Sequence, residues 1–151
     1  MLGPSGDIVD TDETGPTLTF NTIGRHQSML VNTRIASNKS PWLQYMRPDD
    51  IHTIAISHGE GRFVATPETL KRLILNGQVA SQYVDLDGKP TMDVRFNPNG
   101  SMLAIEGITS PDGRIFGKMG HSERSGDNLY KNVPGNKMQE LFRGGVDYFR
   151  F

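Results

Sequence analysis

The residues best suited to chemistry in this chain are a histidine and a glutamate two positions apart, His121 and Glu123, in a turn that follows a predicted strand. An acyl-transfer site needs a general base whose imidazole is held in one tautomer by a carboxylate. Because Glu123 can reach the far ring nitrogen of His121 from such a turn, the pair predicts a base and its orienting acid. His-x-Glu also occurs often by chance, so the spacing alone leaves a surface pair as the alternative.

A second candidate site is the glycine-rich segment Ser57-His58-Gly59-Glu60-Gly61, which follows an apolar stretch. Its two glycines would allow a ligand to approach the backbone closely, and open α/β sheets bind ligands at the carboxyl ends of their strands. An ordinary glycine-rich turn is the structural alternative. The helical His-Glu-x-x-His spacing of zinc enzymes is absent, and no other histidines lie close in sequence, so we predict no metal site.

Cysteine is missing from all 151 residues. Disulfides, thiolate metal sites and a cysteine nucleophile are therefore excluded within this chain. Cysteine-free chains also fit a reducing cytoplasm, although only weakly, because many proteins lack cysteine for no special reason.

Composition and charge place the chain among folded globular proteins. Hydrophobic residues make up 35% and charged residues 22%, with a net charge of -1, which differs from the apolar-poor, highly charged composition of disordered chains. No Lys/Arg run marks a phosphate-binding surface, so we predict no nucleic-acid partner. No apolar stretch reaches about 18 residues, so we predict no membrane span, and the N-terminus lacks the features of a signal peptide. We therefore expect a cytoplasmic location.

Alternating apolar residues and turn signals predict a strand-rich domain with three helices. Strands are predicted over 17–20, 29–35, 51–56, 62–65, 82–86, 92–96, 103–109 and 114–119, with turns at 87–88, 97–100 and 110–113, and residues 1–15 form an irregular lead-in. This mixture favours an α/β or α+β domain over a sandwich. The strands that end at Ile56 and near Met119 both deliver candidate site residues, so we expect them to be neighbours in one sheet.

Helix starts are predicted from capping residues. Ser40-Pro41 and Thr66-Pro67 each place a cap before a proline at the first helical position. In the second of these helices, Leu70, Leu73 and Ile74 are expected to share the buried face, and Gly77 to end it. A third helix is predicted from Asn136 through Phe142, with Gly144-Gly145 as its stop.

Taken together, four ordered segments resemble one family, the class I glutaminase domain that ends phosphoribosylformylglycinamidine synthase. They are Ser-His-Gly-Glu-Gly-Arg-Phe (57–63), Asn-Pro-Asn-Gly-Ser (97–101), Ile-Glu-Gly-Ile-Thr-Ser-Pro-Asp-Gly-Arg (105–114) and Gly-Lys-Met-Gly-His-Ser-Glu-Arg (117–124). Segments 16–41 and 133–142 match as well, so the resemblance covers nearly the whole chain. Ser122 stands where relatives usually have proline, which leaves the flanking His and Glu intact.

This resemblance implies a flavodoxin-like class I glutamine amidotransferase fold within the α/β class, of which residues 1–151 are the C-terminal portion. It implies that His121 is the base, that Glu123 orients it, and that the backbone around Ser57, His58, Gly59 and Glu60 holds glutamine. The family's cysteine attacks the glutamine amide, and the released ammonia reaches a synthetase domain that uses ATP and magnesium. No cofactor is expected in this chain itself.

The absent cysteine is the main departure from the family pattern. We interpret the chain as the last ~150 residues of a domain that would be whole at roughly 250 residues, so its partners are the missing N-terminal half and the synthetase domain. The chain alone is expected to be inactive. Alternatives are another class I amidotransferase, of the GMP or CTP synthase type, and a non-catalytic scaffold or binding domain. Intact His121 and Glu123 oppose the scaffold reading, whereas the missing cysteine favours it.

Overall fold

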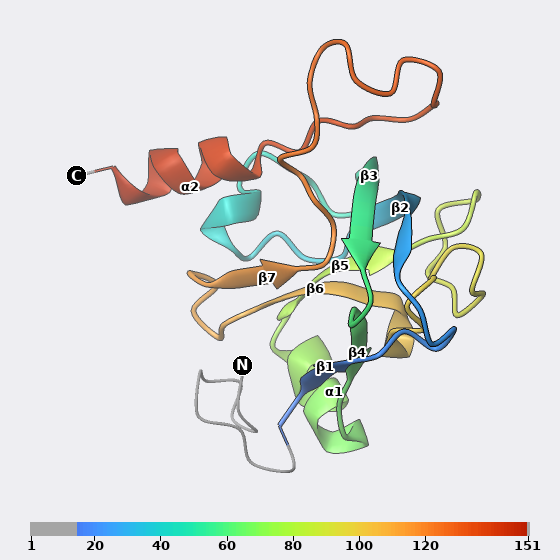
Figure 1. Ribbon diagram of the computed structural model, residues 1–151. Coiled ribbons are helices and arrows are strands. Elements are labelled where there is room, and N and C mark those ends of the chain that lie inside the picture. Colours follow the sequence, from blue (N-terminus) through green and yellow to red (C-terminus); the bar gives the residue numbers. More distant parts are fainter. Residues whose placement is uncertain (1–14, 151) are drawn as a thin grey trace.

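The computed structural model describes residues 15–150, so the expected lead-in over 1–15 lies almost wholly outside the described residues (Figure 1). The strands are β1 (Thr17–Thr19), β2 (Gln27–Ile35), β3 (Ile51–His58), β4 (Arg62–Val64), β5 (Val79–Tyr83), β6 (Ile105–Thr109) and β7 (Phe116–Lys118). The helices are α1 (Pro67–Leu75) and α2 (Leu141–Phe149), with short 3-10 turns at Pro41–Leu43 and Met102–Ala104. The mixed α/β class is confirmed.

Five strands form one sheet in the order β3-β2-β5-β6-β7, and β1 pairs with β4 beside it. Every pairing between the named strands of residues 15–150 is antiparallel. Strands β3 and β7 belong to this one sheet, as predicted, but they lie at opposite ends of its order, so the prediction that they are neighbours in it is wrong. The sheet instead curls until its two ends meet, because the chain just after β7 forms an isolated antiparallel bridge to β3 between His121 and Ala55.

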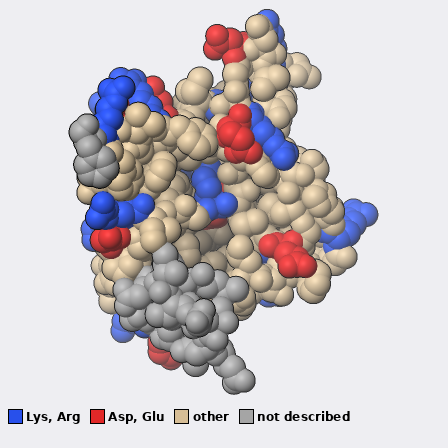
Figure 2. All heavy atoms as spheres, turned by 60° about the vertical axis from the view of Figure 1, so that its left-hand side comes forward, with Lys and Arg blue, Asp and Glu red and all other residues tan. Residues whose placement is uncertain are grey.

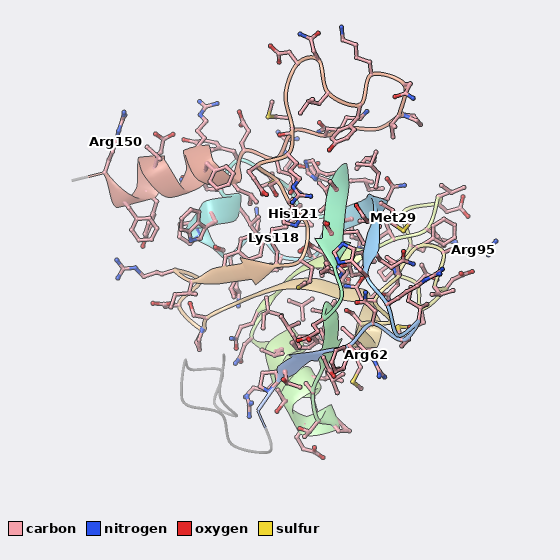
Figure 3. The ribbon with its side chains drawn as sticks, viewed as in Figure 1. Met29, Arg62, Arg95, Lys118, His121 and Arg150 are labelled. Carbon is pink, nitrogen blue, oxygen red and sulfur yellow. The ribbon has the colours of Figure 1, made fainter. Side chains whose placement is uncertain are left out.

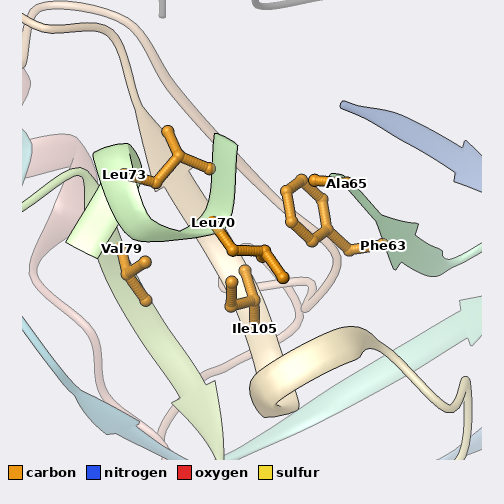
Figure 4. Close-up of a cluster of buried hydrophobic side chains, with 6 residues drawn as sticks. All are labelled: Phe63, Ala65, Leu70, Leu73, Val79 and Ile105. Atoms are coloured by element: carbon orange, nitrogen blue, oxygen red, sulfur yellow. The ribbon is translucent and has the colours of Figure 1, made fainter. Parts of the chain in front are cut away.

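Helix α1 covers one side of the sheet and seals the largest apolar cluster (Figure 4). Buried Leu70 and Leu73 pack against Phe63, Val79 and Ile105. Thr66 caps the helix by accepting a hydrogen bond from the N–H of Thr69 at 3.2 Å, and Gly77 follows its end with φ +66°. The cap and stop predicted from sequence are confirmed.

Ile74 does not share the buried face of α1, contrary to the sequence expectation, since it is 53% exposed. It lies one position beyond Leu73, which turns its side chain about 100° away from the sheet on a helix of 3.6 residues per turn. The buried face of α1 is therefore narrower than predicted, and its apolar members are Leu70 and Leu73.

The hairpin predicted from 82–86 and 92–96 is only partly present. Its turn is confirmed, since Gly88 has φ +77° and donates to the carbonyl of Asp85 at 3.1 Å. Residues 92–96 form no strand, since 92 and 93 are irregular and 94–96 form a turn, and a single bridge joins Val84 to Pro90. Pro90 has no N–H for a ladder, and the carboxylate of Asp85 accepts the N–H groups of Asp87 and Lys89. These local bonds replace a strand pairing.

The last helix begins later and runs further than the sequence predicts. It was expected over Asn136 to Phe142 with Gly144-Gly145 as a stop, yet α2 passes through both glycines. A Cβ on Gly144 would lie 2.7 Å from the carbonyl oxygen of Trp42, and one on Gly145 would clash with the Trp42 ring. The glycines therefore let the helix pack closely against the 3-10 turn that begins at Pro41, and packing outweighs their poor helix propensity.

The cap predicted at Ser40 is confirmed, although the helix that follows is only one 3-10 turn. The two other turn predictions are also confirmed. Gly100 donates to Asn97 at 3.0 Å in the second turn, and the turn over 110–113 joins β6 to β7. The strand predicted from Leu103 begins two residues later, because Leu103 and Ala104 adopt positive φ angles of 52° and 57° that a strand cannot accommodate.

Candidate active site

His121 and Glu123 meet as the sequence predicts, with Nδ1 of His121 2.7 Å from Oε1 of Glu123. The carbonyl of His121 accepts the N–H of Arg124 at 3.1 Å, which closes the turn between them. With Nδ1–H donating to the carboxylate, Nε2 is left free to accept a proton. The His121 side chain is 30% exposed, so a ligand can reach the ring.

Opposing influences set the protonation of Glu123. Partial burial acts to raise the pKa of this carboxyl, but hydrogen bonds from its own backbone N–H and from His121, together with the nearby charges of His121 and Arg124, bring the pKa below its usual value. Glu123 therefore stays ionised at neutral pH, the state in which it can hold the imidazole in one tautomer.

The backbone at His121 is anchored to the far end of the sheet. Its N–H donates to the carbonyl of Ala55 at 2.8 Å, and Figure 3 shows His121 beside β3, with Lys118 close by. Closure of the curled sheet thus brings the predicted base within reach of the strand that ends in the glycine-rich segment.

The segment Ser57 to Gly61 forms the end of β3 and the bend after it. Ser57 and His58 are the last strand residues, and Gly59 and Glu60 make the bend. A Cβ added at Gly59 would meet no atom within 4 Å. The backbone there faces open space, as a close approach by a ligand requires.

Asn21 holds this bend in place through three hydrogen bonds. It is 2% exposed, and its amide donates to the carbonyl of His58 at 2.8 Å, while its own N–H donates to the carbonyl of Gly59 at 2.9 Å. Its Oδ1 accepts the N–H of Gly61 at 3.2 Å. Buried Asn99 adds a hydrogen bond to the carbonyl of Gly61 at 2.7 Å.

The side chain of His58 has a packing role in this structure. Its ring presses on Gly61, where any Cβ would clash with it, and both ring nitrogens are buried without a hydrogen-bond partner among residues 15–150. Burial lowers the pKa of His58, so the ring is neutral. Ser57 has an exposed contact of its own, in which its hydroxyl lies 3.1 Å from Nε2 of His26.

A cavity of about 460 Å³ lies beside the His121–Glu123 pair. Its walls come from Trp42, Leu141, Phe142 and the segment 116–123. Lys118 lines both this cavity and a second one of about 300 Å³ over β6 and β7. Figure 2 shows a hollow in this side of the molecule with basic side-chain atoms inside it.

Sequence reasoning missed four residues that support this site. They are Asn21 and Asn99 under the glycine-rich bend and the buried pair Glu106 and Lys118 under His121. All four lie in segments that carry the family resemblance, but neither a short polar residue in a turn nor a charged residue in a strand shows in the sequence which distant group it will bind. Within residues 15–150 no cluster of three or more metal-ligating side chains is present, and no helix there is sufficiently long and apolar for a membrane crossing.

Comparison with known proteins identifies the family to which this chain is similar. The model of the CobB/CobQ-like glutamine amidotransferase domain matches residues 2–149. Phosphoribosylformylglycinamidine synthase subunit PurQ from Synechocystis sp. is 40% identical over 108 residues, which is 72% of this chain and 47% of PurQ. The PurQ of Methanocaldococcus jannaschii is 34% identical over 132 residues, 87% of this chain and 55% of its own length. The chain thus spans about half the length of the curated relatives it matches.

A solved structure of PurLQS from Thermotoga maritima has a similar fold. It aligns with a TM-score of 0.66 over 89% of this chain and 53% of its own chain, at 24% sequence identity. With the family match, this likeness confirms the predicted class I glutamine amidotransferase-like α/β fold.

Proposed function

This chain belongs to the family of CobB/CobQ-like glutamine amidotransferase domains, and on that premise we propose that it is part of the glutaminase of phosphoribosylformylglycinamidine synthase. In this role it helps to release ammonia from glutamine for the ATP-dependent amidination of formylglycinamide ribonucleotide in purine biosynthesis. The observation that carries the proposal is the 2.7 Å contact between His121 and Glu123, which provides an oriented base beside a ligand-accessible backbone.

In the proposed reaction a thiolate attacks the side-chain amide carbon of glutamine, the C–N bond breaks, and a glutamyl thioester forms. Nε2 of His121, protonated after activating the thiol, gives its proton to the departing ammonia. The same nitrogen then takes a proton from the water that hydrolyses the thioester. Glu123 keeps Nδ1 occupied throughout. Because none of the 151 residues is cysteine, the thiol must come from outside this chain.

Glutamine is proposed to lie against the end of β3, with its α-carboxylate and amino group held by the backbone around Ser57, His58, Gly59 and Glu60. Two observations support this position. The backbone at Gly59 is open to solvent, and Asn21 fixes the bend so that little ordering is needed when glutamine binds.

The proposed partners are a segment that supplies the thiol and a synthetase that binds ATP and magnesium. The similar fold in PurLQS supports such an assembly, and the relatives named as subunits of the synthase support the reaction. The chain itself is proposed to bind no cofactor, and its location is proposed to be the cytoplasm.

The experiment that tests this function compares two nitrogen sources in the assembled enzyme. His121→Ala should abolish synthesis from glutamine and leave synthesis from added ammonia unchanged, because only the first route needs the base. Equal loss of both activities would mean that His121 is structural. If the intact assembly used ammonia but never glutamine, the scaffold alternative would be supported instead.

A further inference from the structure

A buried ion pair lies directly beneath the loop that carries His121. Glu106 on β6 and Lys118 at the end of β7 approach to 3.8 Å between Oε1 and Nζ, and their side chains are 0% and 11% exposed. Removing two charges from water is costly, so a buried pair contributes little net stability by itself. The polar atoms of the two side chains therefore need hydrogen-bond partners, and the positions of these partners indicate which part of the structure the pair stabilises.

Each member of the pair binds a residue next to His121 in the chain. Oε1 of Glu106 accepts the N–H of Gly120 at 2.6 Å. Nζ of Lys118 donates to the hydroxyl of Ser122 at 2.7 Å. The residues immediately before and after His121 are therefore tied to opposite members of one ion pair.

The pair is itself fixed by further contacts. The second oxygen of Glu106 accepts a short hydrogen bond from the hydroxyl of Ser81 on β5. Lys118 also donates to Oε1 of Gln139 at 2.7 Å, and this same oxygen accepts the hydroxyl of Ser122 at 2.5 Å. Burial lowers the pKa of Lys118, and the Glu106 carboxylate opposes that effect.

The fit around Gly120 leaves little freedom for the loop. A Cβ at this position would clash with the side chain of Ile54 on β3 and would lie 2.9 Å from Oε1 of Glu106. The backbone before His121 is thus sandwiched between a strand at one end of the sheet and a carboxylate from β6.

We propose that Glu106 and Lys118 are positioning residues for the glutaminase reaction, which act on His121 through the backbone of Gly120 and the side chain of Ser122. This inference rests on the proposed role of His121. Both are proposed to act without touching the reacting atoms. Without the pair the loop can shift, and a displacement of about 1 Å at a catalytic group can reduce a rate by as much as ~10²-fold.

The test replaces both members at once by apolar residues of similar size, Glu106→Leu with Lys118→Met. Together the two changes leave no unpaired buried charge, so the variant avoids the main cause of misfolding when one partner alone is removed. Gln78→Leu is the matched control, because it deletes an equally buried hydrogen bond to the carbonyl of Thr109 at the other end of β6. Cooperative melting and dispersed amide spectra establish that each variant is folded.

The first measurement uses this chain itself and follows the ¹⁵N resonances of the His121 ring at mildly alkaline pH, assigned with His121→Ala. The parent chain and the Gln78→Leu control should show mainly the tautomer with the proton on Nδ1. The folded double variant should show a mixture of tautomers, because the contact with Glu123 is no longer fixed. An unchanged tautomer ratio would overturn the proposal.

The second measurement uses the assembled enzyme. The double variant should lower kcat for glutamine by on the order of 10²-fold, with KM for glutamine and the ammonia-dependent rate retained, since the Ser57 to Glu60 backbone is untouched. A raised KM for glutamine with kcat unchanged would contradict the positioning role. If the parent assembly failed to use glutamine, the proposed function would fall, while the tautomer measurement would still decide whether the pair orders His121.

Discussion

The backbone N–H of His121 lies 2.8 Å from the backbone carbonyl oxygen of Ala55. Ala55 is part of β3, at one end of the five-stranded sheet, whereas His121 follows β7, at the other end. This bond closes the curled sheet. It also brings the oriented imidazole to the strand whose end is the proposed glutamine site. The geometry of the proposed catalytic site therefore depends on closure of the sheet as much as on the local turn around the histidine.

Replacing Glu123 by Gln should lower kcat for glutamine by on the order of 10-fold, less than the ~10²–10⁴-fold that a general base contributes. The carboxylate is about half exposed, so water can partly replace it in orienting the ring. Initial rates with glutamine and with ammonia in the assembled enzyme check this. A loss as large as that of His121→Ala would show that Glu123 takes part in proton transfer directly.

Replacing Gly59 by Ala should raise KM for glutamine without changing stability. The added methyl group has no atom within 4 Å in the free chain, so it would meet only a ligand that approaches the backbone. Gly126→Ala serves as the control, because its methyl group would make ordinary contact with Leu129 at 3.8 Å, away from the site. Glutamine kinetics and thermal melting separate the two effects, and an unchanged KM would move the glutamine site elsewhere.

Replacing Gly145 by Ala should destabilise the docking of α2, although alanine is the better helix former by about 1 kcal/mol. The methyl group would overlap the ring of Trp42, and such overpacking typically costs about 1–3 kcal/mol. Trp42 fluorescence during urea unfolding measures this change, with Gly126→Ala as the reference. A stabilised variant would mean that α2 does not pack on Trp42 in solution.

Stability should fall as the pH drops below about 6.5, the ordinary value for histidine. Burial lowers the pKa of both His52 and His58 in the folded state. The unfolded chain therefore binds more protons over the window below 6.5, and acid favours unfolding. Above that pH this contribution to stability is fully present.

Replacing His52 by Leu should reduce this pH dependence without abolishing it, because the ring nitrogens of His58 remain buried. Ring atom Nδ1 of His52 has no partner among the described residues, so the apolar replacement breaks no hydrogen bond there. Urea unfolding between about pH 5 and 8 measures the slope in a range where ordinary carboxylates stay charged. An identical slope in the variant would show that His52 is already solvated in the folded chain.

Local signals in the sequence predicted the elements whose ends depend on nearby residues. The cap at Thr66, the stop at Gly77 and the turn at Gly88 each involve bonds within a few positions and were confirmed. The contact between His121 and Glu123 belongs to the same class.

Features set by distant residues could not be predicted in this way. Gly145 interrupts a helical pattern in sequence, but its fit against Trp42, over 100 positions earlier, makes it part of a helix. Likewise, nothing near Glu106 in the sequence shows that its carboxylate will bind Gly120. The first depends on where α2 packs and the second on how the sheet curls, whereas the sequence pattern gives the positions of elements without their packing or the order of the strands.

Ammonia release from glutamine by the purified chain, alone and with a segment that supplies the nucleophilic cysteine of the family, tests the central claim most directly. The chain has the proposed base, His121, in contact with its proposed orienting carboxylate, Glu123, but it has no thiol. The thioester therefore cannot form without that segment. We expect no release above background and no labelling by thiol-alkylating glutamine analogues from the chain alone, and restored release in its presence. Robust release from the chain alone, or none after restoration, would contradict the account.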